Sequence, residues 1–258
     1  MVTTIFKGGM GNQMFQYAIG RILAEHKGYK LEIADPDNRR DLLFNQFPFV
    51  NTAGVDGKEV KDNTMSVAHD LQYMDIDAVK NHSGHVFLHG YWQKYYYYTP
   101  YKEKIRQWFD YPDDQFEKPL PTDLVLHVRL GDQLKPEPIG LPETAETYVE
   151  LLKKIPHERC ILISDELDSP FLDPVKKFPT VVPKKGSQMG DFTMLKYAKR
   201  AIISQSTYAW WATFLGEPEK IWAPLSLGTR RCLWKVCPAV QDIDLIPLDN
   251  TYEIFKIA

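Results

Sequence analysis

The sequence predicts an α/β protein with two Rossmann-like halves that face a central cleft. Short apolar strands alternate with helical segments, most clearly in the second half, and this pattern is typical of parallel, doubly wound sheets. A proline-rich stretch at 118–122, with the sequence KPLPT, interrupts the alternation and predicts a domain boundary. We therefore expect one domain over 1–120 and a second over 121–258.

In the first half, a strand at 2–6 runs into a glycine turn and then into a helix expected over 12–27. The apolar residues of this helix recur at helical spacing, and Gly28 ends it. A strand at 30–34 completes a βαβ unit, which implies a parallel sheet. The segment 36–85 gives no clear prediction. Beyond it we expect a strand at 86–89 and a helix at 101–109.

The second half alternates more regularly. We expect strands at 124–129, 160–164, 180–183, 201–204 and 220–223, and helices near 143–154, 190–200 and 207–216. Ligands bind outside the carboxyl ends of the strands in such sheets, and each polar motif below lies at such an end.

Composition excludes several classes of protein. The net charge is −3 and the charges are interspersed, so nothing predicts a nucleic-acid-binding face. A helix needs about 20 apolar residues to span a bilayer, and no apolar run approaches this length. No signal peptide precedes the first strand, so we expect a cytoplasmic protein. Three cysteines, Cys160, Cys232 and Cys237, do not make a disulfide framework and are expected to be reduced and mostly buried.

The first polar motif is the glycine turn at 8–17, which reads GGMGNQMFQY. A glycine turn that feeds a helix N-terminus presents backbone N–H groups to an anion. Gly9 and Gly11 also match the dinucleotide fingerprint, and Asp35 mimics its ribose-binding carboxylate, but Met14 stands where that fingerprint needs Gly or Ala. A nicotinamide site and a purely structural turn are the alternatives.

The second motif ends the strand at 124–129, where 124–132 read LVLHVRLGD. His127 and Arg129 are two residues apart, so they share a face of the strand and are expected to point into the cleft. Arg129 offers a planar fork of donors that suits a pyrophosphate and can neutralise growing charge without a metal. Asp132 can orient either residue, and an Arg129–Asp132 ion pair is the structural alternative.

The third motif covers 190–211 and reads as helix, buried strand, polar turn and helix. Ser204, Ser206 and Thr207 bring hydroxyls and backbone amides to a helix start, which suits a phosphate. Because Ser and Thr also cap helices, capping is the alternative for these residues.

Together the motifs resemble those of glycosyltransferase family 11, the α-1,2-fucosyltransferases. The family's opening turn is matched at 8–17, its His-x-Arg-Arg-x-Asp strand end in part at 127–132, and its Ile-Ser/Asn-x-Ser-x-x-x-Trp-Trp element at 203–211. Ser164 and Asp165 fit a further strand end. The resemblance runs from residue 2 to about 224 in the expected order.

This resemblance implies a GT-B fold, a GDP-fucose donor on the C-terminal half, and metal-independent transfer with inversion to give an α-1,2 link. It implies that Arg129 grips the pyrophosphate with His127 near the nucleotide, that Asp191 reads the guanine edge, and that Asn12 lines the sugar end of the cleft. The remaining residues expected at the donor are Gly9, Gly11, Asp165, Ser204, Ser206 and Thr207.

The acceptor side is expected at 90–98, which reads GYWQKYYYY and is similar to a Gly-Tyr-aromatic-Gln piece of the family. Aromatic rings stack on sugars and tyrosine hydroxyls bond them, so we expect Tyr91, Trp92 and Gln93 to contact an oligosaccharide or glycan. Burial in the core is the alternative for these large side chains.

An inverting transfer needs a base, which the sequence leaves open among Asp35, Asp132, Glu166, a water and the donor phosphate. Asp35 is preferred because it follows the strand beside the glycine turn, and the expected catalytic set is Arg129, Asn12, Asp35 and Asp132. Asp-x-Asp triplets occur at 35–37, 75–77 and 242–244, but such short patterns arise by chance, and no His or Cys cluster has zinc spacing. We predict no essential metal and no cofactor beyond the donor.

The sequence departs from the family at Leu130, where the second Arg of the motif is missing. Adjacent strand residues face opposite sides, so Leu130 is expected to pack behind the sheet. The departure leaves another GDP- or nucleotide-linked deoxysugar, such as rhamnose, as an alternative donor. Alternatives from other classes are a nicotinamide-dependent oxidoreductase and a catalytically inactive carbohydrate-binding module.

Overall fold

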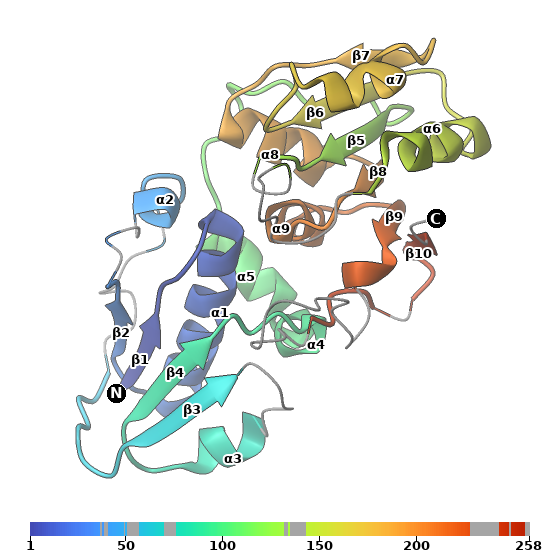
Figure 1. Ribbon diagram of the computed structural model, residues 1–258. Helices are drawn as coiled ribbons and strands as arrows, with labels where there is room; N and C mark the ends of the chain where they lie inside the picture. Colours follow the sequence, from blue (N-terminus) through green and yellow to red (C-terminus); the bar gives the residue numbers. More distant parts are fainter. Residues whose placement is uncertain are drawn as a thin grey trace. The chain divides into compact units, whose positions relative to one another are not determined.

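The computed structural model describes residues 1–36, 38, 41–48, 50, 57–69, 76–131, 134, 143–227, 243–247 and 249–255. Strands and helices alternate along the described chain (Figure 1). The strands are β1 (Val2–Ile5), β2 (Leu31–Ala34), β3 (Met65–His69), β4 (Val86–Gly90), β5 (Leu124–Val128), β6 (Cys160–Ser164), β7 (Val181–Pro183), β8 (Arg200–Ile203), β9 (Lys220–Pro224) and β10 (Tyr252–Phe255). The α-helices are α1 (Met10–Lys27), α2 (Asp41–Phe44), α3 (Ile76–Asn81), α4 (Tyr95–Tyr98), α5 (Lys102–Trp108), α6 (Ala145–Lys154), α7 (Asp173–Lys176), α8 (Gln188–Tyr197) and α9 (Thr207–Leu215).

The chain folds into two compact units. The first is built on Met1–Pro112, which Asp244 also joins, and the second is built on Asp113–Thr229 and the chain from Leu245 on. The boundary expected from the sequence, after residue 120, falls inside the second unit by this division.

The first unit contains a four-stranded parallel sheet in the order β2-β1-β4-β3. Helix α1 packs against β1 and β2 (Figure 1). Because β1 and β4 are neighbours and parallel, the glycine turn after β1 and the aromatic segment after β4 lie at the same edge of the sheet.

Helix α1 begins at Met10, two residues before the start expected from its apolar spacing. Gly9 is the N-cap residue, and the preceding Gly8 has a φ of 76°, which explains the need for glycine there. The helix ends where the sequence predicts, because Gly28 adopts the left-handed conformation at φ 62° and its N–H bonds back to the last turn.

The second unit contains a six-stranded parallel sheet in the order β10-β9-β8-β5-β6-β7. Side chains alternate across β5. Leu124, Leu126 and Val128 lie on the face that packs on α6 and α7, in one buried apolar cluster. The opposite face of β5 carries His127, and α8 contacts this strand and α9.

The parallel α/β architecture was predicted correctly, and so were the strands β1, β2, β4 and β5–β9 to within one or two residues. No element was predicted for α2, β3 and α3, which lie within 36–85, and α4, α7 and β10 were missed. Both β3 and β10 are edge strands, and β10 buries only Phe255 outright, so neither carries the continuous apolar run of a central strand.

Two expectations from composition bear on the described residues. Within these ranges no helix combines the length and apolar character needed to cross a bilayer. Cys160 is a free thiol in the core of the second unit, and burial raises its pKa to about 12. Cys232 and Cys237 lie outside the described residues.

Candidate functional site

Three of the predicted motifs meet at one edge of the second unit. Strand β5 lies between β8 and β6, and all three run parallel, so their carboxyl ends are neighbours. Ser204 follows β8, Arg129 follows β5 and Asp165 follows β6. The sheet topology therefore brings together three residues that are 36 to 75 residues apart in the chain.

His127 is a buried, neutral imidazole at this edge. Its side chain is 6% exposed, and its Nδ1 lies 3.1 Å from Ser204 Oγ. Burial lowers the pKa of His127 to about 4, and the nearby charge of Asp165 opposes this shift only in part. His127 therefore carries no charge at neutral pH.

The backbone that follows β5 is held by side chains from both neighbouring strands. Ser204 Oγ accepts a hydrogen bond from the Arg129 N–H at 3.1 Å. Asp165 uses both carboxylate oxygens, with Oδ1 accepting from the Leu130 N–H at 2.8 Å and Oδ2 from the Gly131 N–H at 3.1 Å. The structure thus places Ser204 and Asp165 against the backbone of the Arg129 turn, although both were expected to contact a donor.

The departure at Leu130 has a structural explanation. Leu130 is fully buried in the apolar cluster beneath α6, as the alternation along the strand predicts. Its side chain lies on the opposite side of the chain from His127, in the apolar cluster.

Asp191 has unused hydrogen-bonding capacity. It lies in the first turn of α8, and its Oδ1 is buried without a hydrogen-bond partner among the described residues. Burial raises the pKa of Asp191 to about 6, and the charge of Lys184 opposes the shift. Gly186 covers this oxygen so closely that a Cβ there would lie 2.5 Å from Oδ1. A ligand that donates N–H groups to this carboxylate would recover part of the lost solvation.

Tyr208 connects Asp191's helix to His127. Its ring centroid lies 5.9 Å from that of His127 and 5.3 Å from that of Phe192, the residue after Asp191. Its hydroxyl donates to the carbonyl of Gln188 in the first turn of α8. The side chain of Tyr208, which no sequence motif singled out, therefore joins α9, α8 and β5 in one aromatic contact.

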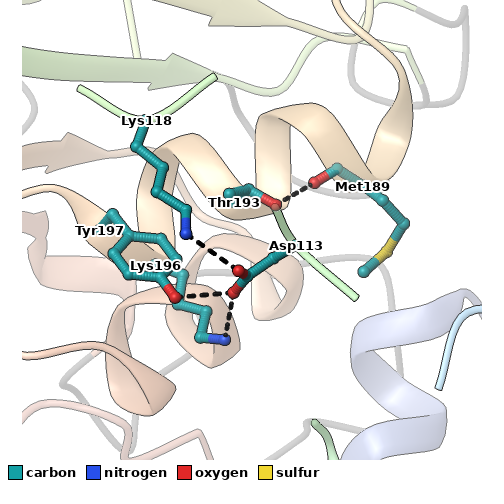
Figure 2. A network of polar contacts seen from close by, with 6 residues as sticks. All are labelled: Asp113, Lys118, Met189, Thr193, Lys196 and Tyr197. Carbon is teal, nitrogen blue, oxygen red and sulfur yellow. Dashed lines mark hydrogen bonds and ion pairs between the residues drawn. The ribbon is translucent and has the colours of Figure 1, made fainter. Parts of the chain in front are cut away.

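The other end of α8 is anchored by a polar network around Asp113 (Figure 2). The Asp113 carboxylate accepts hydrogen bonds from Lys118 at 2.9 Å, Lys196 at 3.0 Å and the Tyr197 hydroxyl at 2.7 Å. Burial alone would raise the pKa of Asp113, but these three donors outweigh it and lower the pKa to about 2. The network fixes the C-terminal turn of the helix whose first turn carries Asp191.

The polar turn before α9 serves partly as a helix cap. Ser206 is the N-cap residue, and its Oγ accepts from the Ala209 N–H at 3.3 Å. Thr207 is the first residue of α9 and is half-buried. The capping alternative therefore describes Ser206 in this structure.

The first unit has its own polar site, at the shared edge of β1 and β4. Gln93 Nε2 donates to Asn12 Oδ1 at 2.9 Å, and Gln93 Oε1 is buried without a hydrogen-bond partner among the described residues. Gln16 ties the two strand ends together, since its Oε1 accepts from the Lys7 N–H and its Nε2 donates to the Gly90 carbonyl. Asn12 folds over Gly8, where a Cβ would lie 2.4 Å from Asn12 Nδ2.

The acceptor residues expected at 91–93 differ in exposure. Tyr91 is half-buried, Gln93 is 3% exposed, and the Trp92 ring is fully buried. Trp92 has a φ of 57°, and its carbonyl accepts from the Tyr98 hydroxyl at 2.6 Å and the Lys94 N–H at 2.9 Å. Packing, and not stacking on a ligand, is the role that this burial supports for Trp92.

Of the other expected residues, Gly9 caps α1, and Gly11 is buried in its first turn. Asp35 directly follows β2, next to the strand that leads into the glycine turn. Glu166 is exposed beside Asp165. Asp132 lies outside the described residues. Within the described ranges, no three His, Cys, Asp or Glu side chains gather as they would to hold a metal ion.

Comparison with known proteins gave one informative result. No family of known sequences and no curated protein matches the chain, so membership of the α-1,2-fucosyltransferase family stays a prediction. Among solved structures, the chain is similar to a mutant of Arabidopsis thaliana FUT1 in complex with GDP, with a TM-score of 0.54 and 13% identity over 95% of this chain and 74% of that one. This likeness shows that the protein has an α/β fold of the GT-B type, as the sequence predicted.

Proposed function

We propose that this protein is a glycosyltransferase that takes its sugar from a GDP-linked donor. The fold supports the proposal, because the similar Arabidopsis structure was solved with GDP. The sheet edge with Arg129 and His127 supports it further, because nucleotide-binding α/β sheets hold their ligands at the carboxyl ends of the strands.

The observation that carries the proposal is the Asp191 carboxylate. A guanine ring presents adjacent N–H donors on one edge, and a carboxylate accepts from such a pair, whereas adenine offers a donor beside an acceptor. Asp191 is desolvated and incompletely hydrogen-bonded, and Tyr208 links its helix turn to His127. A guanine edge would satisfy it.

We further propose that the donor is GDP-fucose and that transfer inverts the anomeric carbon. A hydroxyl of the acceptor sugar attacks that carbon, the bond from carbon to the β-phosphate oxygen breaks, and GDP leaves with the bonding electron pair. The hydroxyl proton passes to a base. The guanidinium of Arg129 neutralises the charge that grows on the pyrophosphate, which would let the reaction proceed without a metal.

The acceptor belongs to the first unit in this proposal. Gln93 lies at the shared edge of β1 and β4 with Asn12, to which its Nε2 donates, and its Oε1 has no hydrogen-bond partner among the described residues. Tyr91 adds a half-buried aromatic side chain to the same segment. The α-1,2 linkage is part of the proposal and rests on the sequence resemblance alone.

A donor panel tests the proposal. The protein is incubated with GDP-fucose, GDP-rhamnose, GDP-mannose and UDP-galactose, with and without a panel of galactosides, and released nucleotide is measured. We expect nucleotide release from GDP-fucose, faster with an acceptor whose product carries fucose on its 2-hydroxyl. Turnover of GDP-rhamnose alone would show that the donor is GDP-rhamnose and not GDP-fucose. The absence of turnover with every GDP-sugar would reject the proposed function.

Substitutions of Arg129 test the proposed role of its guanidinium in the same assay. We expect Arg129→Ala to lower kcat/KM for the donor by about 100- to 1,000-fold, the usual effect of removing one preorganised donor from a developing charge. Arg129→Lys keeps the charge but loses the planar fork, so it should recover only part of the rate. Arg106→Ala, which removes the same charge from an ion pair on α5, is the control. Near-normal activity of Arg129→Ala would remove it from the pyrophosphate site.

A further inference from the structure

The turn after β5 has three consecutive backbone N–H groups, and side chains already occupy all of them. The Arg129 N–H bonds Ser204 Oγ, and the N–H groups of Leu130 and Gly131 bond the two oxygens of Asp165. Two of them, the N–H groups of Leu130 and Gly131, converge on one carboxylate, and successive N–H groups that converge in a turn form an anion-binding concavity. In this protein the anion that fills it is the protein's own carboxylate.

We propose that Asp165 is a positioning residue that holds the Arg129 turn in place by filling this concavity. The inference rests on the proposed function and assigns different roles to the backbone and to the arginine side chain of the Arg129 turn. A pyrophosphate cannot use the N–H groups of residues 129–131 while Asp165 and Ser204 hold them. The leaving group is therefore met by the side chain of Arg129 and not by the backbone of its turn.

The geometry of the neighbouring glycine supports the same assignment. A Cβ at Gly131 would lie 2.9 Å from Asp165 Oδ2, so any larger residue would displace the carboxylate. Among the described residues other than its chain neighbours, the next nearest atom to that Cβ would be Asp165 Cγ at 3.7 Å. A side chain at 131 would thus press on the end of the Asp165 side chain, while the backbone there does not adopt a left-handed conformation that would itself favour glycine.

The two hydrogen bonds from the Leu130 and Gly131 N–H groups to Asp165, here called the Asp165 clamp, are well placed to direct Arg129. Leu130, the residue between Arg129 and Gly131, is fixed on one side by the Asp165 bond to its N–H and on the other by burial of its side chain. Arg129 is fixed through Ser204. An arginine carried on a turn that is held on both sides loses less conformational freedom when it binds an anion, so the transition state is stabilised more.

A double-mutant cycle tests the inference. Asp165→Ala removes the clamp, and Gly131→Ala is expected to displace it, so each should lower kcat/KM for the donor by about 10- to 100-fold, the range expected for a misplaced catalytic group. In the Asp165→Ala background the added methyl no longer meets the Asp165 carboxylate, and Glu166 Oε1 lies at an ordinary contact distance of 3.9 Å from it, so Gly131→Ala should then cost little. Asp168→Ala, an exposed aspartate on the same loop, is the control.

A second measurement does not depend on activity. Exchange of the Leu130 and Gly131 amide hydrogens is followed by NMR in the wild type and in Asp165→Asn, which keeps the shape but offers one acceptor instead of two. We expect both amides to be protected in the wild type and at least one to lose protection in the variant. Unchanged protection, additive effects in the cycle, or full activity of Asp165→Ala would overturn the inference. A wild-type protein with protected amides but no GDP-sugar turnover would reject the proposed function instead.

Discussion

The Asp191 carboxylate has a buried oxygen to which a ligand could donate a hydrogen bond. A buried carboxylate oxygen without a hydrogen bond costs about 1–3 kcal/mol of stability, and Asp191 Oδ1 is such an atom among the described residues. Groups whose pKa is strongly shifted cluster at functional sites, which makes a ligand a candidate for the missing partner. The raised pKa of Asp191 has the same physical cause, which is the loss of water around the charged form.

Asp191→Asn should weaken GDP binding by about 10- to 100-fold, because the amide offers one acceptor where a guanine edge needs two and carries no charge. Isothermal titration calorimetry measures the effect, with Asp173→Asn as the control. Asp173 occupies the first turn of α7 but is exposed and paired with Lys176. An affinity for GDP that is unchanged in Asp191→Asn would remove this residue from the guanine site.

The pH dependence of GDP binding follows from the same group. Asp191 in the free protein has a pKa of about 6, and only its ionised form accepts two N–H donors. We expect the Asp191 contribution to GDP affinity to be constant above this pH and to fall as the pH drops below it, so that the pH dependence is weaker in Asp191→Asn, in which only the titration of the GDP phosphate at about pH 6 remains. Equal pH profiles for the two proteins would show that another group controls binding.

His127 should contribute to the pH dependence of folding. Its pKa is about 4 in the folded protein, against an ordinary 6.5, so between these values the unfolded chain binds a proton that the folded protein does not. The free energy of unfolding should therefore fall as the pH is lowered from 6.5 to 4, by up to about 3 kcal/mol from this residue. In His127→Gln this part of the pH dependence of the unfolding free energy is lost. Urea titrations at several pH values measure the unfolding free energy of both proteins.

At the scale of elements, α8 carries Asp191 of the proposed donor site, and α8 and α9 contact each other. Tyr208 on α9 bonds the first turn of α8, and Asp113 fixes the last turn of α8 through Lys196 and Tyr197 (Figure 2). The position of Asp191 is therefore set by contacts at both ends of a ten-residue helix.

Tyr208→Phe should separate this support from the aromatic packing. The variant keeps the ring beside His127 and Phe192 but loses the hydroxyl that bonds the Gln188 carbonyl, so GDP binding should weaken by about 3- to 10-fold, the worth of one hydrogen bond. Tyr29→Phe, which loses a hydroxyl bonded to the Ser83 carbonyl in the first unit, is the control. Equal GDP affinities in the two variants would show that the Tyr208 hydroxyl does not support the site.

The elements that the sequence predicted well are those that bury apolar residues in regular runs. The central strands of both sheets read as apolar segments, and Gly28 marked a helix end because only glycine adopts that conformation freely. The roles of Asp165 and Ser204 were not accessible in the same way. Both act on the backbone of a strand end that is 34 to 75 residues away, and no local pattern encodes such a contact.

At the scale of the whole molecule, each unit contains its own parallel sheet, and in both units polar residues gather at the carboxyl ends of the strands. Asn12 and Gln93 meet at this edge in the first unit, and His127, Ser204 and Asp165 do so in the second. This arrangement is the general consequence of parallel α/β topology, in which loops that leave the carboxyl ends are free of the packing demands of the core.

The most direct test of a GDP-sugar site is calorimetric titration of the whole protein with GDP, repeated with excess EDTA and with ADP in place of GDP. We expect GDP to bind, its affinity to survive the chelator, and ADP to bind at least about tenfold more weakly because its base lacks the paired donors that Asp191 accepts. Binding that vanishes with EDTA would contradict metal independence. Absence of GDP binding, or equal binding of ADP, would contradict the proposal that the second unit holds a GDP-linked donor.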